Sequence, residues 1–306
     1  MRFRLGLNLV AGQGNLERAF QQLGNISDIG DDWIRIAGME AGAADGGSES
    51  GAAWSWERKL RVDLPNTTFI AYGPYGIRGL DARWEGAEHV TMLTRFGWNV
   101  GNIHSVGDRA TSTFLDAFEE AKKRGLFVEG SRLTIDHLLM VRPQDIIRMK
   151  ELEVWPNIAP WFFLMPPNDD VVLHQYGEER MNKMMPVKSY IDAGIKPSGG
   201  ADIDTRPYRD PLWVIEKFVT RKDGKGRVWN PEEKVTRQQA LWMMTNWAAY
   251  AIGDQKKLGT IESGKLADLV VLDGDYMTVP EEEISKIPVV MTVVGGKVIY
   301  ERPGQF

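Results

Sequence analysis

One segment of the sequence, residues 97–124 (GWNVGNIHSVGDRATSTFLDAFEEAKKR), limits the fold most strongly because it joins a short apolar strand to a helix through a histidine. Residues 98–103 have the composition of a buried strand, and Asp108 is a natural N-cap for the helix that follows the turn at Gly107. In a parallel sheet covered by helices, the carboxyl ends of the strands form the functional rim. His104 lies at such an end. It is a candidate metal ligand or base, and a packing histidine is an equally weighted alternative.

The same order of strand, polar residue, loop and helix recurs along most of the chain. It predicts an α/β fold, an incomplete TIM-type (β/α)8 barrel with about six strand and helix units, two short of eight. Local signals mark the helix starts: Pro143, Asp210 with Pro211, and a capping box of Thr236 and Gln239. The predicted strands are residues 2–10, 33–39, 98–103, 133–135, 154–159 and 195–201. The predicted helices include residues 16–23, 82–96, 178–193 and 237–252.

The last part of the chain has a different pattern. Residues 259–273 and 289–300 are short β-rich segments with tight GK and GG turns and no long helix between them. They predict a small antiparallel sheet packed beside the barrel, part of a β-sandwich domain. We therefore expect a barrel portion at residues 1–254 and a C-terminal β portion at residues 255–306.

Composition excludes several classes of function. The net charge is -5 with acidic and basic residues interspersed, which argues against a nucleic-acid or membrane-surface partner. The absence of cysteine excludes disulfides, thiolate metal sites and cysteine nucleophiles. The sequence contains neither a convincing signal peptide nor an apolar run of the roughly 20 residues needed to span a bilayer. We expect a cytoplasmic protein.

Four predicted strand ends carry side chains that suit a divalent metal ion: Glu40, His104, His137 and Asp202. Neutral imidazole nitrogen and anionic carboxylate oxygen are the ligands that such an ion takes, with one position left for water. A bound ion lowers the pKa of that water to about 7. Asp202 could then take and return a proton during the reaction. By count alone the motif is weak, and a purely structural role for the four residues is the alternative.

Four stretches of the chain have a pattern typical of one family: GWNVGNIHSVGDRA (97–110), RLTIDHLLMVRPQDI (132–146), DAGIKPSGGADIDTRPYRDPL (192–212) and residues 257–300. They resemble the amidohydrolase superfamily of metal-dependent hydrolases, in the branch that includes N-substituted formamide deformylase. The resemblance implies that His104 and His137 are the metal-binding histidines after the fifth and sixth barrel strands. It implies that Asp202 is the acid after the eighth strand, which carries the proton and binds metal.

Two departures from the family pattern matter. The branch usually carries a metal-bridging carboxylated lysine after the fourth strand, where this chain offers Glu40. The HxH pair of the first strand has no counterpart among the four histidines, so the sequence resembles the family from the third barrel strand onward. Our hypothesis is a hetero-oligomer in which a second polypeptide supplies the first two strands and the HxH pair. A truncated sequence is the alternative.

The resemblance implies a metal-dependent hydrolase acting on an amide-like C–N bond of a small molecule. Zinc is the expected metal, as one or two ions, with Fe2+ or Mn2+ as alternatives. Arg206 is a candidate for holding a carboxylate or carbonyl of the substrate. Other metal-assisted reactions (deamination, ring opening, hydration or decarboxylation) and a non-catalytic subunit stay open. The aromatic residues expected to give an apolar pocket, favouring an aromatic or hydrophobic substrate, are Trp54, Trp56, Tyr75, Trp161 and Phe162.

Overall fold

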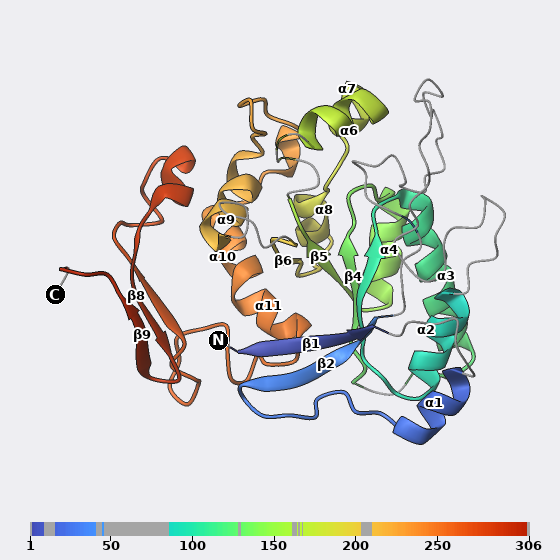
Figure 1. The fold of residues 1–306 in the computed structure, drawn as a ribbon. Coiled ribbons are helices and arrows are strands. Elements are labelled where there is room, and N and C mark those ends of the chain that lie inside the picture. Colours follow the sequence, from blue (N-terminus) through green and yellow to red (C-terminus); the bar gives the residue numbers. More distant parts are fainter. Residues whose placement is uncertain are drawn as a thin grey trace.

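The computed structural model describes residues 2–8, 16–40, 45, 86–127, 130–160, 164, 166, 168–202 and 210–304. Within these residues, six parallel strands form one sheet flanked by helices, and three antiparallel strands form a second sheet to one side (Figure 1). The predicted α/β class with a partial TIM-type barrel is confirmed, and so is the antiparallel sheet near the C-terminus.

The parallel sheet follows the order of the chain. Each strand pairs with the next one along the sequence, from β1 to β6, and every pair is parallel. Sequential order without a reversal is the topology of a barrel and not of a doubly wound sheet. The strands are β1 (Phe3–Asn8), β2 (Ile34–Glu40), β3 (Val100–Ser105), β4 (Leu133–His137), β5 (Val154–Ile158) and β6 (Ser198–Gly199).

The helices form the outer layer of this barrel portion. Helices α2, α3 and α4 pack beside β3 to β5, and α10 and α11 contact β6. No helix in the described ranges is long and apolar enough to cross a membrane. The helices are α1 (Leu16–Leu23), α2 (Gly86–Arg95), α3 (Asp108–Lys123), α4 (Pro143–Glu151), α6 (Asn168–Tyr176), α7 (Glu178–Met181), α8 (Val187–Asp192), α9 (Pro211–Thr220), η2 (Pro231–Glu233), α10 (Arg237–Met244), α11 (Asn246–Ala251) and η3 (Glu281–Lys286).

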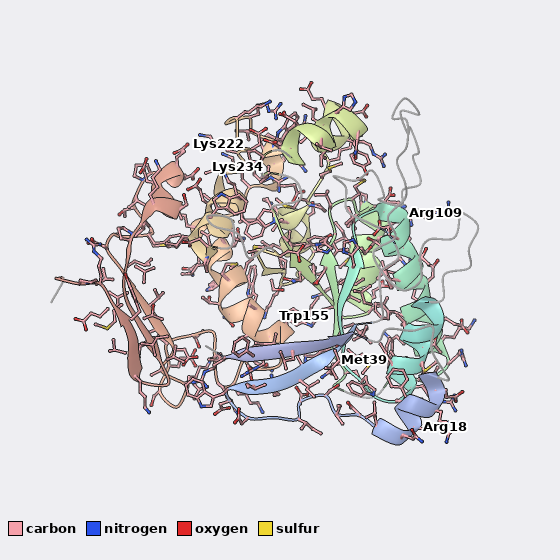
Figure 2. All side chains as sticks on the ribbon, viewed as in Figure 1. Arg18, Met39, Arg109, Trp155, Lys222 and Lys234 are labelled. Carbon is pink, nitrogen blue, oxygen red and sulfur yellow. The ribbon has the colours of Figure 1, made fainter. Side chains whose placement is uncertain are left out.

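The hydrophobic core lies between the sheet and its helices, where side chains fill the space between the ribbons (Figure 2). Ile103, Ile135 and Ile158 from three neighbouring strands are fully buried there, as are Phe114 and Phe118 of α3. Successive side chains of a strand point to opposite faces. His104, Asp136 and Asn157 are each next to one of these isoleucines in the chain, so their side chains are directed to the opposite face of the sheet.

Three predicted helix starts are confirmed. Pro143 is the first residue of α4, where its missing N–H is not needed. Asp210 caps α9 by accepting a hydrogen bond from the Leu212 N–H at 3.0 Å. Thr236 and Gln239 form both hydrogen bonds of a capping box at the start of α10.

Two long helices predicted from the sequence are wrong, because each is interrupted. The predicted helix 237–252 breaks at Thr245, which has φ -133° and ψ -89° and whose hydroxyl donates to the carbonyl of Leu241 at 2.7 Å. Such back-bonding competes with regular helical geometry. The predicted helix 178–193 is divided into α7 and α8. Pro186 lies before α8 and has no N–H to continue the first helix.

The C-terminal sheet consists of β7 (Leu269–Leu272), β8 (Val289–Val294) and β9 (Lys297–Glu301). Its connecting segment η3 packs against α9, and the Ser285 N–H donates to Glu216 of that helix at 3.0 Å. The boundary between residues 254 and 255 stays a prediction.

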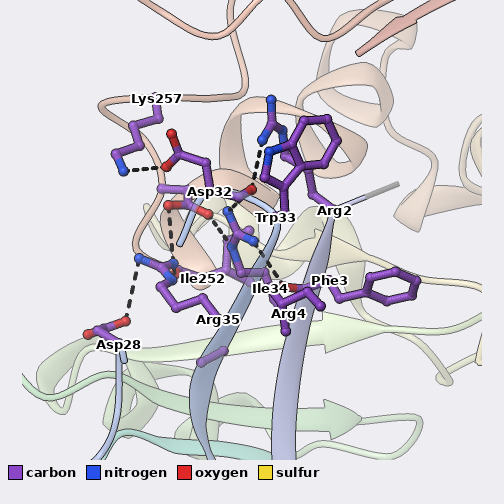
Figure 3. A network of polar contacts seen from close by, with 12 residues as sticks. Arg2, Phe3, Arg4, Asp28, Asp32, Trp33, Ile34, Arg35, Ile252 and Lys257 are labelled. Atoms are coloured by element: carbon purple, nitrogen blue, oxygen red, sulfur yellow. Dashed lines mark hydrogen bonds and ion pairs between the residues drawn. The ribbon is translucent and has the colours of Figure 1, made fainter. Parts of the chain in front are cut away.

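A network of charged side chains joins the first strands to the segment after α11 (Figure 3). Arg4 pairs with the buried carboxylate of Asp254 at 2.5 Å, and Arg35 approaches the other oxygen of that carboxylate at 3.1 Å. Arg2 holds Asp268, directly before β7, through two hydrogen bonds. Residues more than 200 positions apart are thus fixed together at the amino-terminal ends of the strands.

Candidate functional site

Three of the predicted site residues come from the carboxyl ends of parallel strands. His104 lies near the end of β3, and His137 is the last residue of β4. In the register of these two strands, His104 pairs with Asp136 and Ser105 pairs with His137. The two histidines are therefore offset by one residue on neighbouring strands. Asp202 follows β6, the last strand of the sheet.

The two histidine rings are in direct contact. Their centroids are 4.3 Å apart and their planes are inclined at 67°. His137 is only 7% exposed, and both its Nδ1 atom and the Nε2 atom of His104 are buried. Burial, followed by the neighbouring His104 ring, lowers the pKa of His137 well below its ordinary value of 6.5. The imidazole is therefore neutral at pH 7, the form that binds a metal ion.

Asp202 brings a carboxylate to this pair. Its Oδ2 atom lies 3.8 Å from Nδ1 of His137, which is longer than a direct hydrogen bond. The side chain of Asp202 is 43% exposed, whereas His137 is buried. Asp202 is therefore much more exposed than the buried His137 beside it, a suitable place for a group that exchanges protons with a substrate.

The backbone at these strand ends adopts an uncommon conformation. His137, Leu138 and Asp202 have φ angles of 73°, 46° and 54°, in the left-handed region that residues other than glycine seldom enter. Hydrogen bonds from the Leu138 N–H to the Ser105 carbonyl at 2.9 Å help to hold this turn. Such conformations cost about 1–3 kcal/mol each and cluster at functional sites. Their position here supports a functional role for the rim.

Asp45 holds the turn that follows His104, a role that sequence reasoning missed because Asp45 with Gly46 indicates only a local turn. Its buried carboxylate accepts hydrogen bonds from the N–H groups of Val106 at 3.0 Å and Gly107 at 2.7 Å. These groups follow His104 directly. The prediction that Asp108 is the N-cap of α3 is wrong: Gly107 is the N-cap, and Asp45 holds the turn from a distant part of the chain.

His104, His137 and Asp202 have side chains of the types that bind zinc in proteins. However, no group of three His, Cys, Asp or Glu side chains among the described residues lies close enough together to hold a metal ion. Glu40 ends β2 beside Asn8 of β1, and its side chain lies outside the described part. Trp54, Trp56, Tyr75, Trp161, Phe162 and Arg206, predicted to contact substrate, also lie outside the described residues.

The sequence as a whole matches known proteins. The model of the amidohydrolase family matches residues 2–300. The chain belongs to the amidohydrolase family. The N-substituted formamide deformylase of Arthrobacter pascens is 30% identical to this amidohydrolase over 217 residues, which make up 69% of the chain and 38% of the relative. The protein LONG AFTER FAR-RED 3 of Arabidopsis thaliana is 29% identical over 273 residues, or 88% of the chain and 44% of the relative.

A solved structure shares the fold of this amidohydrolase. An uncharacterized metal-dependent hydrolase from Pyrococcus furiosus superimposes with a TM-score of 0.66 and 26% sequence identity, covering 91% of this chain and 52% of that protein. The chain thus spans only about half, or less, of the length of these three proteins.

Proposed function

We propose that this chain carries the metal-binding and proton-transferring part of a hydrolase that cleaves an amide-like C–N bond in a small molecule. The observation that carries the proposal is the convergence of His104, His137 and Asp202 at one end of the parallel sheet. Membership in the amidohydrolase family supports the same reaction class. Two histidines in contact and a half-exposed carboxylate are side chains suited to metal-assisted hydrolysis.

His104 and His137 would hold a divalent ion, with Asp202 as a further ligand. We expect zinc, as one or two ions, because imidazole and carboxylate are its usual ligands; Fe2+ and Mn2+ take similar donors. Such an ion, when bound, would polarise the substrate carbonyl and activate water. Burial keeps His137 neutral and its ring packed against His104. Because no three described ligands lie close enough together to hold an ion, binding would have to bring Asp202 or a further ligand closer to the pair.

Asp202 is proposed as the proton carrier. Its Oδ2 atom would take a proton from the water that adds to the carbonyl carbon, and it would return that proton to the nitrogen as the C–N bond breaks. The balance is one water consumed and one amine and one acid formed. Its partial exposure lets Asp202 reach the substrate while it stays next to His137.

The substrate is proposed to be aromatic or otherwise hydrophobic. Trp54, Trp56, Tyr75, Trp161 and Phe162 would line an apolar pocket, and Arg206 would hold a carbonyl or carboxylate of the substrate. Because one relative is named an N-substituted formamide deformylase, N-substituted formamides are the first compounds to test.

Further protein is proposed to complete the site. Strands β1 and β6 are the two ends of the parallel sheet, and on β1 Phe3 and Leu5 are 47% and 42% exposed. Exposed apolar edges are templates for additional strands. We propose that a second polypeptide pairs with this sheet and brings the HxH histidine pair to the rim. If the chain purified alone is monodisperse, loaded with metal and active, or if one longer polypeptide carries all the strands, this arrangement is refuted.

Metal analysis tests the proposed function. The purified protein, with any partner that copurifies, should contain bound divalent metal and release formate from an N-substituted formamide. His104→Ala and His137→Ala should lose both properties. His174→Ala is the matched control, since that histidine is an exposed residue of α6 and not a strand-end residue. Equal metal content in all four proteins would show that the histidine pair is structural.

A further inference from the structure

A hydrogen-bonded row of polar side chains crosses the sheet next to the histidine pair. Asn157 of β5 donates from Nδ2 to Oδ1 of Asp136 on β4 at 2.9 Å. Its own Oδ1 accepts a hydrogen bond from the Ser198 hydroxyl of β6 at 3.1 Å. The carboxylate of Asp136 only accepts, so it fixes Nδ2 of Asn157 on its own side and turns Oδ1 toward the Ser198 hydroxyl, which also lies 3.4 Å from the Pro156 carbonyl. Asn157 is therefore fixed between its two neighbours.

The strand register brings this row to the level of the site. Asp136 pairs with His104 on one side and with Asn157 on the other, and Asn157 pairs with Ser198. All four residues lie at one level across four adjacent strands. The row therefore begins at one of the proposed ligands and ends at the strand that leads to Asp202.

The Asn157 amide also lies against the backbone after β6. A Cβ atom built onto Gly200 would be 3.6 Å from Oδ1 of Asn157, an ordinary van der Waals distance, so the amide packs beside this part of the backbone. The Gly200 N–H donates to the Ile158 carbonyl at 2.9 Å, which ties the same two strands together. Asp202 is two residues further along the chain.

We propose that Asn157 is a positioning residue that sets the relative placement of His137 and Asp202. It anchors Asp136, which directly precedes His137, and it contacts Ser198 and Gly200, which lead into Asp202. This inference rests on the proposed function, because the placement matters only if the two side chains act together. Sequence alone did not single out Asn157, since its partners are 21 and 41 residues away.

Buried polar residues in any barrel need hydrogen bonds, so a purely structural role must be distinguished by experiment. Asn157→Ala removes the link. The double variant Asp136→Asn with Asn157→Asp restores it with donor and acceptor exchanged, and Ser198 can still donate to the new carboxylate. Asn25→Ala is the control, because its amide likewise makes one donated and one accepted hydrogen bond, to the Gly97 carbonyl and from the Ser27 N–H.

Zinc affinity, measured by competition with a chelator, is the first measurement. Loss of a residue that orients a metal ligand typically lowers affinity about 10- to 100-fold. We expect such a loss for Asn157→Ala, recovery of most of it in the exchanged double variant, and no loss for Asn25→Ala. A loss in Asn157→Ala equal to that in Asn25→Ala, or a double variant no better than Asn157→Ala, would overturn the proposal.

Ring resonances of 15N-labelled histidine in the metal-free protein are the second measurement. The chain has only four histidines, which can be assigned by single substitutions. Asn157→Ala should shift the resonances of His104 and His137 and leave His174 unchanged; unchanged resonances at the pair would overturn the proposal. If Asn157→Ala does not fold, Ser198→Ala removes the donor to Oδ1, together with a longer hydrogen bond to the Pro156 carbonyl at 3.4 Å, and should shift the same two rings. Wild-type protein that binds no zinc would refute the proposed function instead, and the metal-free spectra would still decide the role of Asn157.

Discussion

Removal of the Asp254 carboxylate should destabilise the protein strongly, because it joins the first two strands to the segment after α11. The side chain is 2% exposed, and its partners Arg4 and Arg35 are 9% and 14% exposed. Removing one member of a buried ion pair typically costs about 3–5 kcal/mol. Both arginines keep carbonyl partners, such as Phe3 for Arg4 and Ile252 for Arg35. We therefore expect the lower end of that range for Asp254→Ala, about 3 kcal/mol.

Thermal unfolding measures this effect directly. At about 2–4 °C per kcal/mol, the midpoint of Asp254→Ala should fall by about 6–12 °C. The control is Lys257→Ala in the same network, where the lysine and its partner Asp32 are both more than one third exposed. Exposed ion pairs contribute little, so this variant should melt close to wild type. If Asp254→Ala melts like Lys257→Ala, the buried network does not hold the first strands in place.

Three further predictions concern the rim. The pKa of His137 is lowered in the folded protein, so the unfolded chain takes up the proton first as pH falls below 6.5. Wild type should therefore lose up to about 1.4 kcal/mol of unfolding free energy per pH unit below pH 6.5. His137→Gln should flatten this dependence in denaturant titrations between pH 7.5 and 5.5, and His174→Gln should leave it unchanged. Asp45→Ala leaves two buried N–H groups after β3 without their acceptor. This should lower the free energy of urea unfolding by about 1–3 kcal/mol and weaken zinc binding. Wild-type stability together with wild-type zinc affinity would refute the role of Asp45 in holding this turn. Asp202→Asn should lower kcat about 100-fold or more while the protein keeps its fold, and full activity would exclude Asp202 as the proton carrier.

Local signals predicted the helix starts well. The starts at Pro143, Asp210 and Thr236 depend on residues within one turn of the helix, so the sequence contains all the information needed. Interruptions inside helices were missed, because the apolar pattern continues across Thr245 although the backbone does not.

The candidate site was predicted in part, because the end of a strand can be recognised from residues close together in the sequence. Strand ends identified His104, His137 and Asp202, since parallel strands in chain order must place their carboxyl ends on one rim. Asp45 and Asn157 were missed. Asp45 binds N–H groups 61 and 62 residues away, and Asn157 acts through the register of three strands, so neither role leaves a local pattern.

The central claim is that His104, His137 and Asp202 hold one catalytic metal ion. Anomalous diffraction at the zinc absorption edge, from crystals of the zinc-loaded protein with any partner that copurifies, tests it most directly. The account predicts a zinc peak about 2.0–2.2 Å from a ring nitrogen of each histidine and from a carboxylate oxygen of Asp202. A zinc ion bound elsewhere, with the two histidine rings still packed on each other at 4.3 Å, would contradict it.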